Sequence, residues 1–171
     1  HGSIAVETEV NVGTTFTVRL HIPEAIENAS CALKTEHAET GPGLAGKNIL
    51  LCEDNAINTE VAGLILQRIG LTYDAAANGR EGLDLFEKSP QGTYDAILMD
   101  IRMPAMDGIE TTHAIRALDR PDATAILIIA LTADAFEDDV RRDREAGMNA
   151  HVSKPIDPDT LERVLSEEIY R

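Results

Sequence analysis

The 171-residue sequence contains no tryptophan, and aromatic residues make up 4% of it, so any core must be built from aliphatic side chains. Its two cysteines, Cys31 and Cys52, lack the C-x-x-C spacing of zinc sites and redox motifs. We therefore expect reduced thiols and a cytoplasmic location. No apolar run approaches the ~20 residues of a membrane-spanning helix, so direct membrane contact is not expected.

Basic residues are scarce, with 15 Lys and Arg against 30 Asp and Glu, which gives a formal net charge of −15. A surface this acidic argues against direct binding to nucleic acid. Hydrophobic residues make up 43% of the chain, which is enough for a domain of ordinary size with a further small piece.

Residues 1–22 alternate apolar and polar side chains on either side of a turn at 9–14, which predicts a β-hairpin. Pro23 ends this pattern. Residues 24–46 have no sustained apolar period and are typical of a linker.

From Lys47 onward, strand and helix patterns alternate five times. The predicted strands are 48–52, 71–77, 96–99, 125–131 and 149–153, each followed by a helical pattern. In the first helix, apolar residues recur at helical spacing at Ile57, Val61, Leu64, Ile65 and Ile69. Such alternation predicts an α/β domain, in which a parallel sheet has helices on both faces.

Polar side chains follow four of the predicted strands. Glu53 and Asp54 follow the first strand and Asp100 the third, while Thr132 and Lys154 follow the fourth and fifth. The carboxyl edge of a parallel sheet is where ligands bind, so these side chains should meet there. Carboxylates without His or Cys favour Mg²⁺, and a lysine with a hydroxyl suits a phosphoryl group. Taken alone, Asp100 could equally cap a turn.

The chain resembles a response-regulator receiver domain, the phospho-accepting module of two-component signalling. The resemblance rests on four segments in order: Cys52-Glu53-Asp54-Asn55, Met99 to Gly108, Ala130-Leu131-Thr132-Ala133 and Ser153-Lys154-Pro155. It covers residues 47–171 and implies a doubly wound, flavodoxin-like sheet of order 2-1-3-4-5 with five helices.

The resemblance also implies the role of each site residue. Asp100 would accept the phosphoryl group. Mg²⁺ would be held by Asp54, Glu53 and Asp100, together with the backbone carbonyl of Arg102. Lys154 would pair with phosphoryl oxygens.

Three further features concern the switch and the lysine. Pro155 would follow a cis peptide bond that aims Lys154, and Thr132 would be the switch hydroxyl. His151 stands where the family usually has Tyr or Phe as a second switch residue. Because histidine titrates near neutral pH, the readout could depend on pH.

Residues 1–23 are similar to the last hairpin of the histidine-kinase ATP-binding domain, without its nucleotide-binding motifs. Followed by a linker and a receiver, this hairpin suggests the carboxy-terminal receiver of a hybrid sensor histidine kinase. The expected partners are a histidine kinase core or a histidine phosphotransfer protein. The oligomeric state stays open, a dimer included.

Two rival interpretations remain at this stage. A degenerate receiver would bind partners without being phosphorylated, although Asp54, Asp100, Thr132 and Lys154 are all intact. A Mg²⁺-dependent aspartyl phosphatase would have a second Asp where this sequence has Arg102. We expect a phosphoacceptor that dephosphorylates itself, rather than an enzyme that turns over an external substrate.

Overall fold

The computed structural model describes residues 3–9, 13–19, 43–133 and 137–170, which form two separate units. The first is a hairpin of β1 (Ser3–Glu9) and β2 (Gly13–Arg19), paired antiparallel with Ile4 opposite Val18. The predicted hairpin is therefore confirmed. Cys31 and most of the predicted linker lie outside the described residues.

The second unit alternates strands and helices. Its strands are β3 (Asn48–Cys52), β4 (Thr72–Ala76), β5 (Ala96–Asp100), β6 (Leu127–Thr132) and β7 (Ala150–Ser153). Its helices are α1 (Ala56–Arg68), α2 (Gly79–Lys88), α3 (Gly108–Arg116), α4 (Glu137–Glu145) and α5 (Pro158–Ile169). No helix in the described part of the chain is long and apolar enough to cross a membrane.

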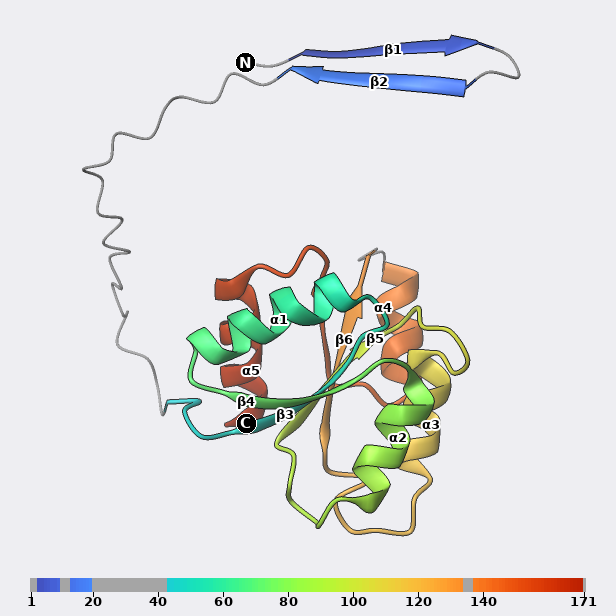
Figure 1. Ribbon diagram of the computed structural model, residues 1–171. Coiled ribbons are helices and arrows are strands. Elements are labelled where there is room, and N and C mark those ends of the chain that lie inside the picture. The colour runs from blue at the N-terminus through green and yellow to red at the C-terminus, as the bar shows by residue number, and fades with distance from the viewer. Residues whose placement is uncertain (1–2, 10–12, 20–42, 134–136, 171) are drawn as a thin grey trace, which may run out of the picture. The chain divides into compact units, whose positions relative to one another are not determined.

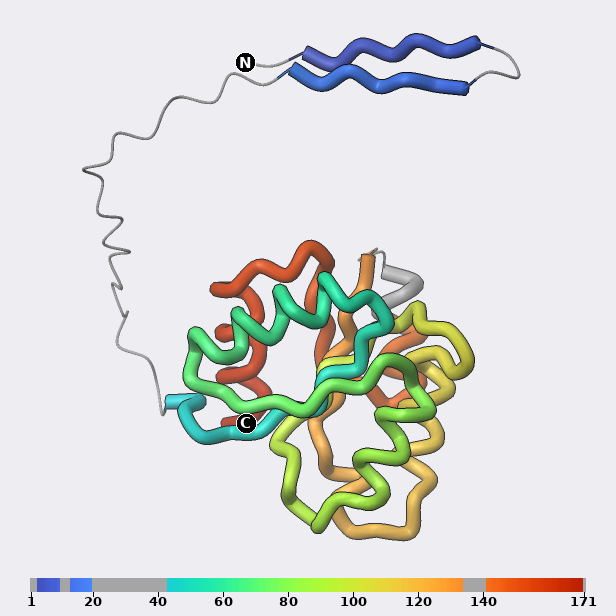
Figure 2. The backbone as a smooth tube through the Cα atoms, in the orientation of Figure 1, coloured from blue at the N-terminus to red at the C-terminus, as the bar shows by residue number. Residues whose placement is uncertain are grey.

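The five strands form one parallel sheet in the order β4-β3-β5-β6-β7, which confirms the predicted 2-1-3-4-5 arrangement. Helices α1 and α5 cover one face of the sheet, and α2, α3 and α4 lie on the other (Figure 1). Figure 2 traces the backbone from each strand through a helix to the next strand. This is the doubly wound fold expected of alternating βα units.

Each face of the sheet buries its own aliphatic core. Toward α1 and α5, the core contains Ile49, Leu51, Leu66, Leu98, Ile129, Leu131, Leu161 and Leu165. Toward α2 and α3, it contains Leu50, Phe86, Ile97, Met99, Ile115 and Ile128. Because alternate residues of one strand point to opposite faces, the central strands are apolar throughout.

The helix ends follow local side-chain chemistry. Asp107 accepts a hydrogen bond from the backbone N–H of Glu110, whose carboxylate accepts one from the backbone N–H of Asp107, a capping box at the start of α3. Asp157 caps α5, which has Pro158 in its first turn. In both cases an aspartate immediately before the helix satisfies a backbone N–H of the first turn.

The apolar residues that recur at helical spacing in α1 do not form one buried stripe. Ile57, Val61 and Leu64 are 72%, 48% and 61% exposed. The face toward the sheet instead buries Ala62 and Leu66, together with the predicted Ile65. The helix is apolar on two sides, so its periodicity did not identify the buried one.

The start of the second unit packs against its end. Leu44, at the end of the predicted linker, is buried in the core under α1 and α5. The Tyr170 hydroxyl, just after α5, donates a hydrogen bond of 3.0 Å to the Gly43 carbonyl. The contact joins the two ends of this unit.

Candidate functional site

The carboxyl edge of the sheet contains an open pocket of about 400 Å³. Glu53 and Asp54 follow β3, while Asp100 and Thr132 are the last residues of β5 and β6. Lys154 follows β7, and all five side chains line this pocket. The structure therefore brings together the residues that the strand ends predicted.

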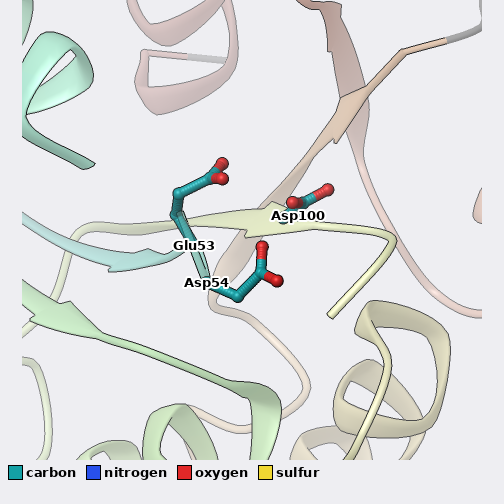
Figure 3. Close-up of side chains that lie close together, drawn as sticks. All are labelled: Glu53, Asp54 and Asp100. Atoms are coloured by element: carbon teal, nitrogen blue, oxygen red, sulfur yellow. The ribbon is translucent and has the colours of Figure 1, made fainter. Parts of the chain in front are cut away.

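Three carboxylates converge in the pocket. Glu53 and Asp54 extend from the turn after β3 toward Asp100 on β5 (Figure 3). One carboxylate oxygen from each lies within 4.8 Å of the other two. Glu53 and Asp100 are buried, whereas Asp54 is exposed. An all-oxygen donor set of this charge, open on one side, fits Mg²⁺ with part of its water shell retained.

Lys154 lies opposite the carboxylates and contacts two of them. Its ammonium is 2.5 Å from Glu53 Oε2 and 2.7 Å from Asp100 Oδ2. The backbone N–H of Lys154 donates to the Thr132 carbonyl at 2.7 Å, which ties the end of β7 to β6. The Lys154–Pro155 peptide bond is cis, as predicted. A single cation thus balances two buried anions.

The loop after β5 fixes the direction of Asp100. Its Oδ1 accepts a hydrogen bond of 3.1 Å from the backbone N–H of Arg102, and its Oδ2 faces Lys154. A Cβ on Gly108 would lie 2.3 Å from the Asp100 carbonyl oxygen, so only glycine lets α3 start this close to the strand. Both oxygens of Asp100 therefore face fixed donors.

Two pocket residues come from the charged helix α4. Arg142 and Asp143 were not predicted as site residues, yet both line the pocket, and Asp143 is 5% exposed. A highly charged helix gives no local sign of which side chains it buries. Only the packing of α4 against the sheet reveals them.

Asn58 also lines the pocket, although the sequence did not assign it to the site. Its side-chain amide donates a hydrogen bond of 2.9 Å to Glu53 Oε1. The spacing Glu53-x-x-x-x-Asn58, with a helix cap between, could have indicated this contact, because the first turn of a helix folds back over its N-terminus.

His151 does not line the pocket. It lies on β7, half-buried, in register with Ala130 of β6. Its predicted switch role stays a prediction.

Cys52, at the end of β3, is fully buried beneath the site. Burial raises the pKa of its thiol to about 12, so the thiol is protonated at neutral pH. This thiol is accordingly a packing group rather than a reactive one.

Fold and site together define a class: a doubly wound α/β domain with an acidic pocket and one lysine at the carboxyl edge of its sheet. The chain belongs to the response regulator receiver domain family, whose model matches residues 49–166.

Sequence relatives include hybrid kinases. The chain is 31% identical to the aerobic respiration control sensor protein ArcB of Escherichia coli over 97% of its length. It is 35% identical to hybrid signal transduction histidine kinase I of Dictyostelium discoideum over 77% of its length. The matches span only 20% and 8% of those two proteins.

Solved receiver structures share the fold. One is the receiver domain of the sensor histidine kinase PA1611 from Pseudomonas aeruginosa, with magnesium coordinated in its active-site cleft. It is 38% identical, has a TM-score of 0.66, and matches 74% of this chain and all of its own. Another is the Saccharomyces cerevisiae receiver domain of Ssk1, crystallised with the histidine phosphotransfer protein Ypd1. It is 29% identical, with a TM-score of 0.64, and the match covers 71% of this chain and 87% of that one.

Proposed function

We propose that residues 47–171 are a phospho-accepting receiver in a two-component phosphorelay, and that Asp100 takes a phosphoryl group from a phosphohistidine. The observation that carries this proposal is the lysine bridge, in which Lys154 contacts both Glu53 and Asp100 at the mouth of an acidic pocket. A nucleophilic carboxylate beside a cation is the arrangement that phosphoryl transfer requires.

The transfer exchanges one bond for another. The P–N bond of the donor phosphohistidine breaks, and a P–O bond to an Asp100 carboxylate oxygen forms, giving an acyl phosphate. Mg²⁺, when bound, neutralises phosphoryl charge. Glu53, Asp54, Asp100 and the backbone carbonyl of Arg102 would hold it, while Lys154 pairs with phosphoryl oxygens.

Phosphorylation would change partner binding through the residues beside the pocket. The Thr132 hydroxyl would move toward the new phosphoryl group, because Thr132 is buried at the end of β6 and lines the pocket. His151 on β7 would follow as the second switch residue. The added charge then biases a two-state equilibrium of this edge of the domain.

We also propose that the chain comes from a hybrid sensor histidine kinase, and that this part of the kinase lies in the cytoplasm whether or not the parent protein is anchored in a membrane. Residues 1–23 would be the last hairpin of the kinase ATP-binding domain and 24–46 a linker. Two observations support this origin: the hairpin exists, and the match to ArcB extends over 97% of the chain. The phosphodonor would be the kinase core or a histidine phosphotransfer protein.

The test is phosphorylation by a small phosphodonor with Mg²⁺, followed by mass spectrometry of the intact chain. We expect a gain of one phosphoryl group that disappears in Asp100→Asn and in the presence of a chelator. Asp84→Asn is the matched control and should be phosphorylated normally, because Asp84 is a half-buried carboxylate on α2 that pairs with Lys88 and does not line the pocket. No mass gain in the wild type would favour a binding-only module. Steady hydrolysis of an external phosphoester would favour a phosphatase.

A further inference from the structure

Asn58 lies in the first turn of α1, directly beside the acidic pocket. The Asn55 side chain caps this helix and accepts hydrogen bonds from the backbone N–H groups of Ile57 and Asn58, at 2.9 and 3.3 Å. Because α1 begins immediately after the turn that contains Glu53, the third residue of the helix comes back over that turn. The cap therefore places the Asn58 amide within reach of Glu53.

Glu53 is buried and depends on few donors. Only 3% of the residue is exposed. Its Oε1 accepts from the Asn58 amide at 2.9 Å, with a longer contact of 3.4 Å to the backbone N–H of Asn55. Its Oε2 faces the Lys154 ammonium at 2.5 Å. Each oxygen thus has one short side-chain partner.

The two partners differ in what else they contact. Lys154 is shared with Asp100, and its charge opposes the arrival of another cation in the pocket. The Asn58 amide is neutral, so it orients Glu53 without that opposition. A carboxylate oxygen has two lone-pair directions, so a metal or its water can take the direction of the longer, 3.4 Å contact with the Asn55 N–H while Oε1 still accepts from Asn58.

We propose that Asn58 is a positioning residue, whose amide holds the Glu53 carboxylate in the orientation that receives the divalent cation. The presence of a bound metal ion in this inference rests on the proposed function. The choice of Asn58 rests on its contact with Glu53. Hydrogen-bond partners of metal-ligating groups commonly change metal affinity by about 10–100-fold when they are removed.

The test measures Mg²⁺ affinity of the unphosphorylated full chain by isothermal titration calorimetry. Asn58→Leu keeps the size of the side chain and removes the donor, and we expect binding about tenfold weaker or worse. Gln67→Leu, an exposed residue of the same helix, is the matched control and should bind Mg²⁺ as the wild type does. Asn58→Ala should repeat the loss with a smaller side chain.

The same substitution in a chain that lacks the Glu53 carboxylate distinguishes positioning of Glu53 from a general effect on helix α1. If Asn58 acts through Glu53, Asn58→Leu should change Mg²⁺ affinity no further in a chain that already carries Glu53→Ala. An equal loss in both backgrounds, or wild-type affinity in Asn58→Leu, overturns the inference while leaving the phosphoacceptor proposal standing. Absence of Mg²⁺ binding by the wild type overturns both.

Discussion

Replacing Lys154 by methionine should destabilise the chain in a way that Mg²⁺ reverses. The substitution keeps most of the aliphatic stem and removes the ammonium that lies between Glu53 and Asp100. Glu53 and Asp100 are 3% and 7% exposed, so little of their charge is solvated by bulk water. The variant therefore keeps two anions side by side with their shared cation gone.

The expected loss in the free energy of unfolding follows from the distance between the two carboxylates. The carboxylate oxygens lie within 4.8 Å of one another. Two unit charges at that distance repel by about 3 kcal/mol at an effective dielectric constant of about 20. Removing one partner of a buried ion pair costs about 3–5 kcal/mol, which agrees with this figure. We expect a loss of about 3 kcal/mol in the free energy of unfolding without metal, and a smaller loss in excess Mg²⁺.

The assay is urea unfolding followed by circular dichroism, with a chelator or with Mg²⁺. Lys47→Met is the matched control, since Lys47 pairs with Asp95 at 2.9 Å on a partly exposed surface outside the site. Such a pair contributes about 0–1 kcal/mol, and its loss should not depend on Mg²⁺. A Lys154→Met chain as stable as the wild type in chelator would refute the reasoning.

Three smaller predictions concern the rest of the fold. Hydrogen bonds from Arg120 lower the pKa of Asp122 to about 2, below its usual 3.8. The wild type should therefore have a larger free energy of unfolding than Asp122→Asn above about pH 4. This difference should be lost as the pH falls toward 2, as measured by urea unfolding across that pH range. A Cβ at Gly82 would lie 2.5 Å from Cys52 Sγ. Gly82→Ala should therefore cost about 1–3 kcal/mol in thermal unfolding, and Cys52→Ala should recover part of it. Leu64→Ser, on the exposed face of α1, should change the unfolding free energy by less than about 0.5 kcal/mol, and a loss of several kcal/mol would place it in the core.

Local patterns predicted the elements well because they depend on neighbours in the chain. Residues 49–52 and 96–99 are continuous apolar runs within two strands, and Asp107 and Asp157 each stand immediately before a helix. Helix α1 shows the limit of such patterns. Ile57, Val61 and Leu64 are as apolar as the buried residues, and nothing in the helix itself says which face meets the sheet.

The residues of the site likewise include some that the sequence predicted and some that only the structure revealed. The sequence predicted that Glu53, Asp100 and Lys154 lie at strand ends. Because parallel strands bring their carboxyl ends to one edge of the sheet, it also predicted that the three residues meet there. The contact between Asn58 and Glu53 was not predicted, although the spacing of the two residues could have indicated it, and the burial of Asp143 has no sign in the sequence. They depend on how a helix is seated against the sheet.

The sequence by itself determined the order of strands and helices, their caps and the residues at the strand ends. Each of these depends on interactions within a few residues of the chain. The tertiary structure alone decided that one ammonium bridges Glu53 and Asp100, residues that are far from Lys154 in the sequence. Distances between distant segments are set by packing two layers of helices on the sheet, and no local pattern carries that information.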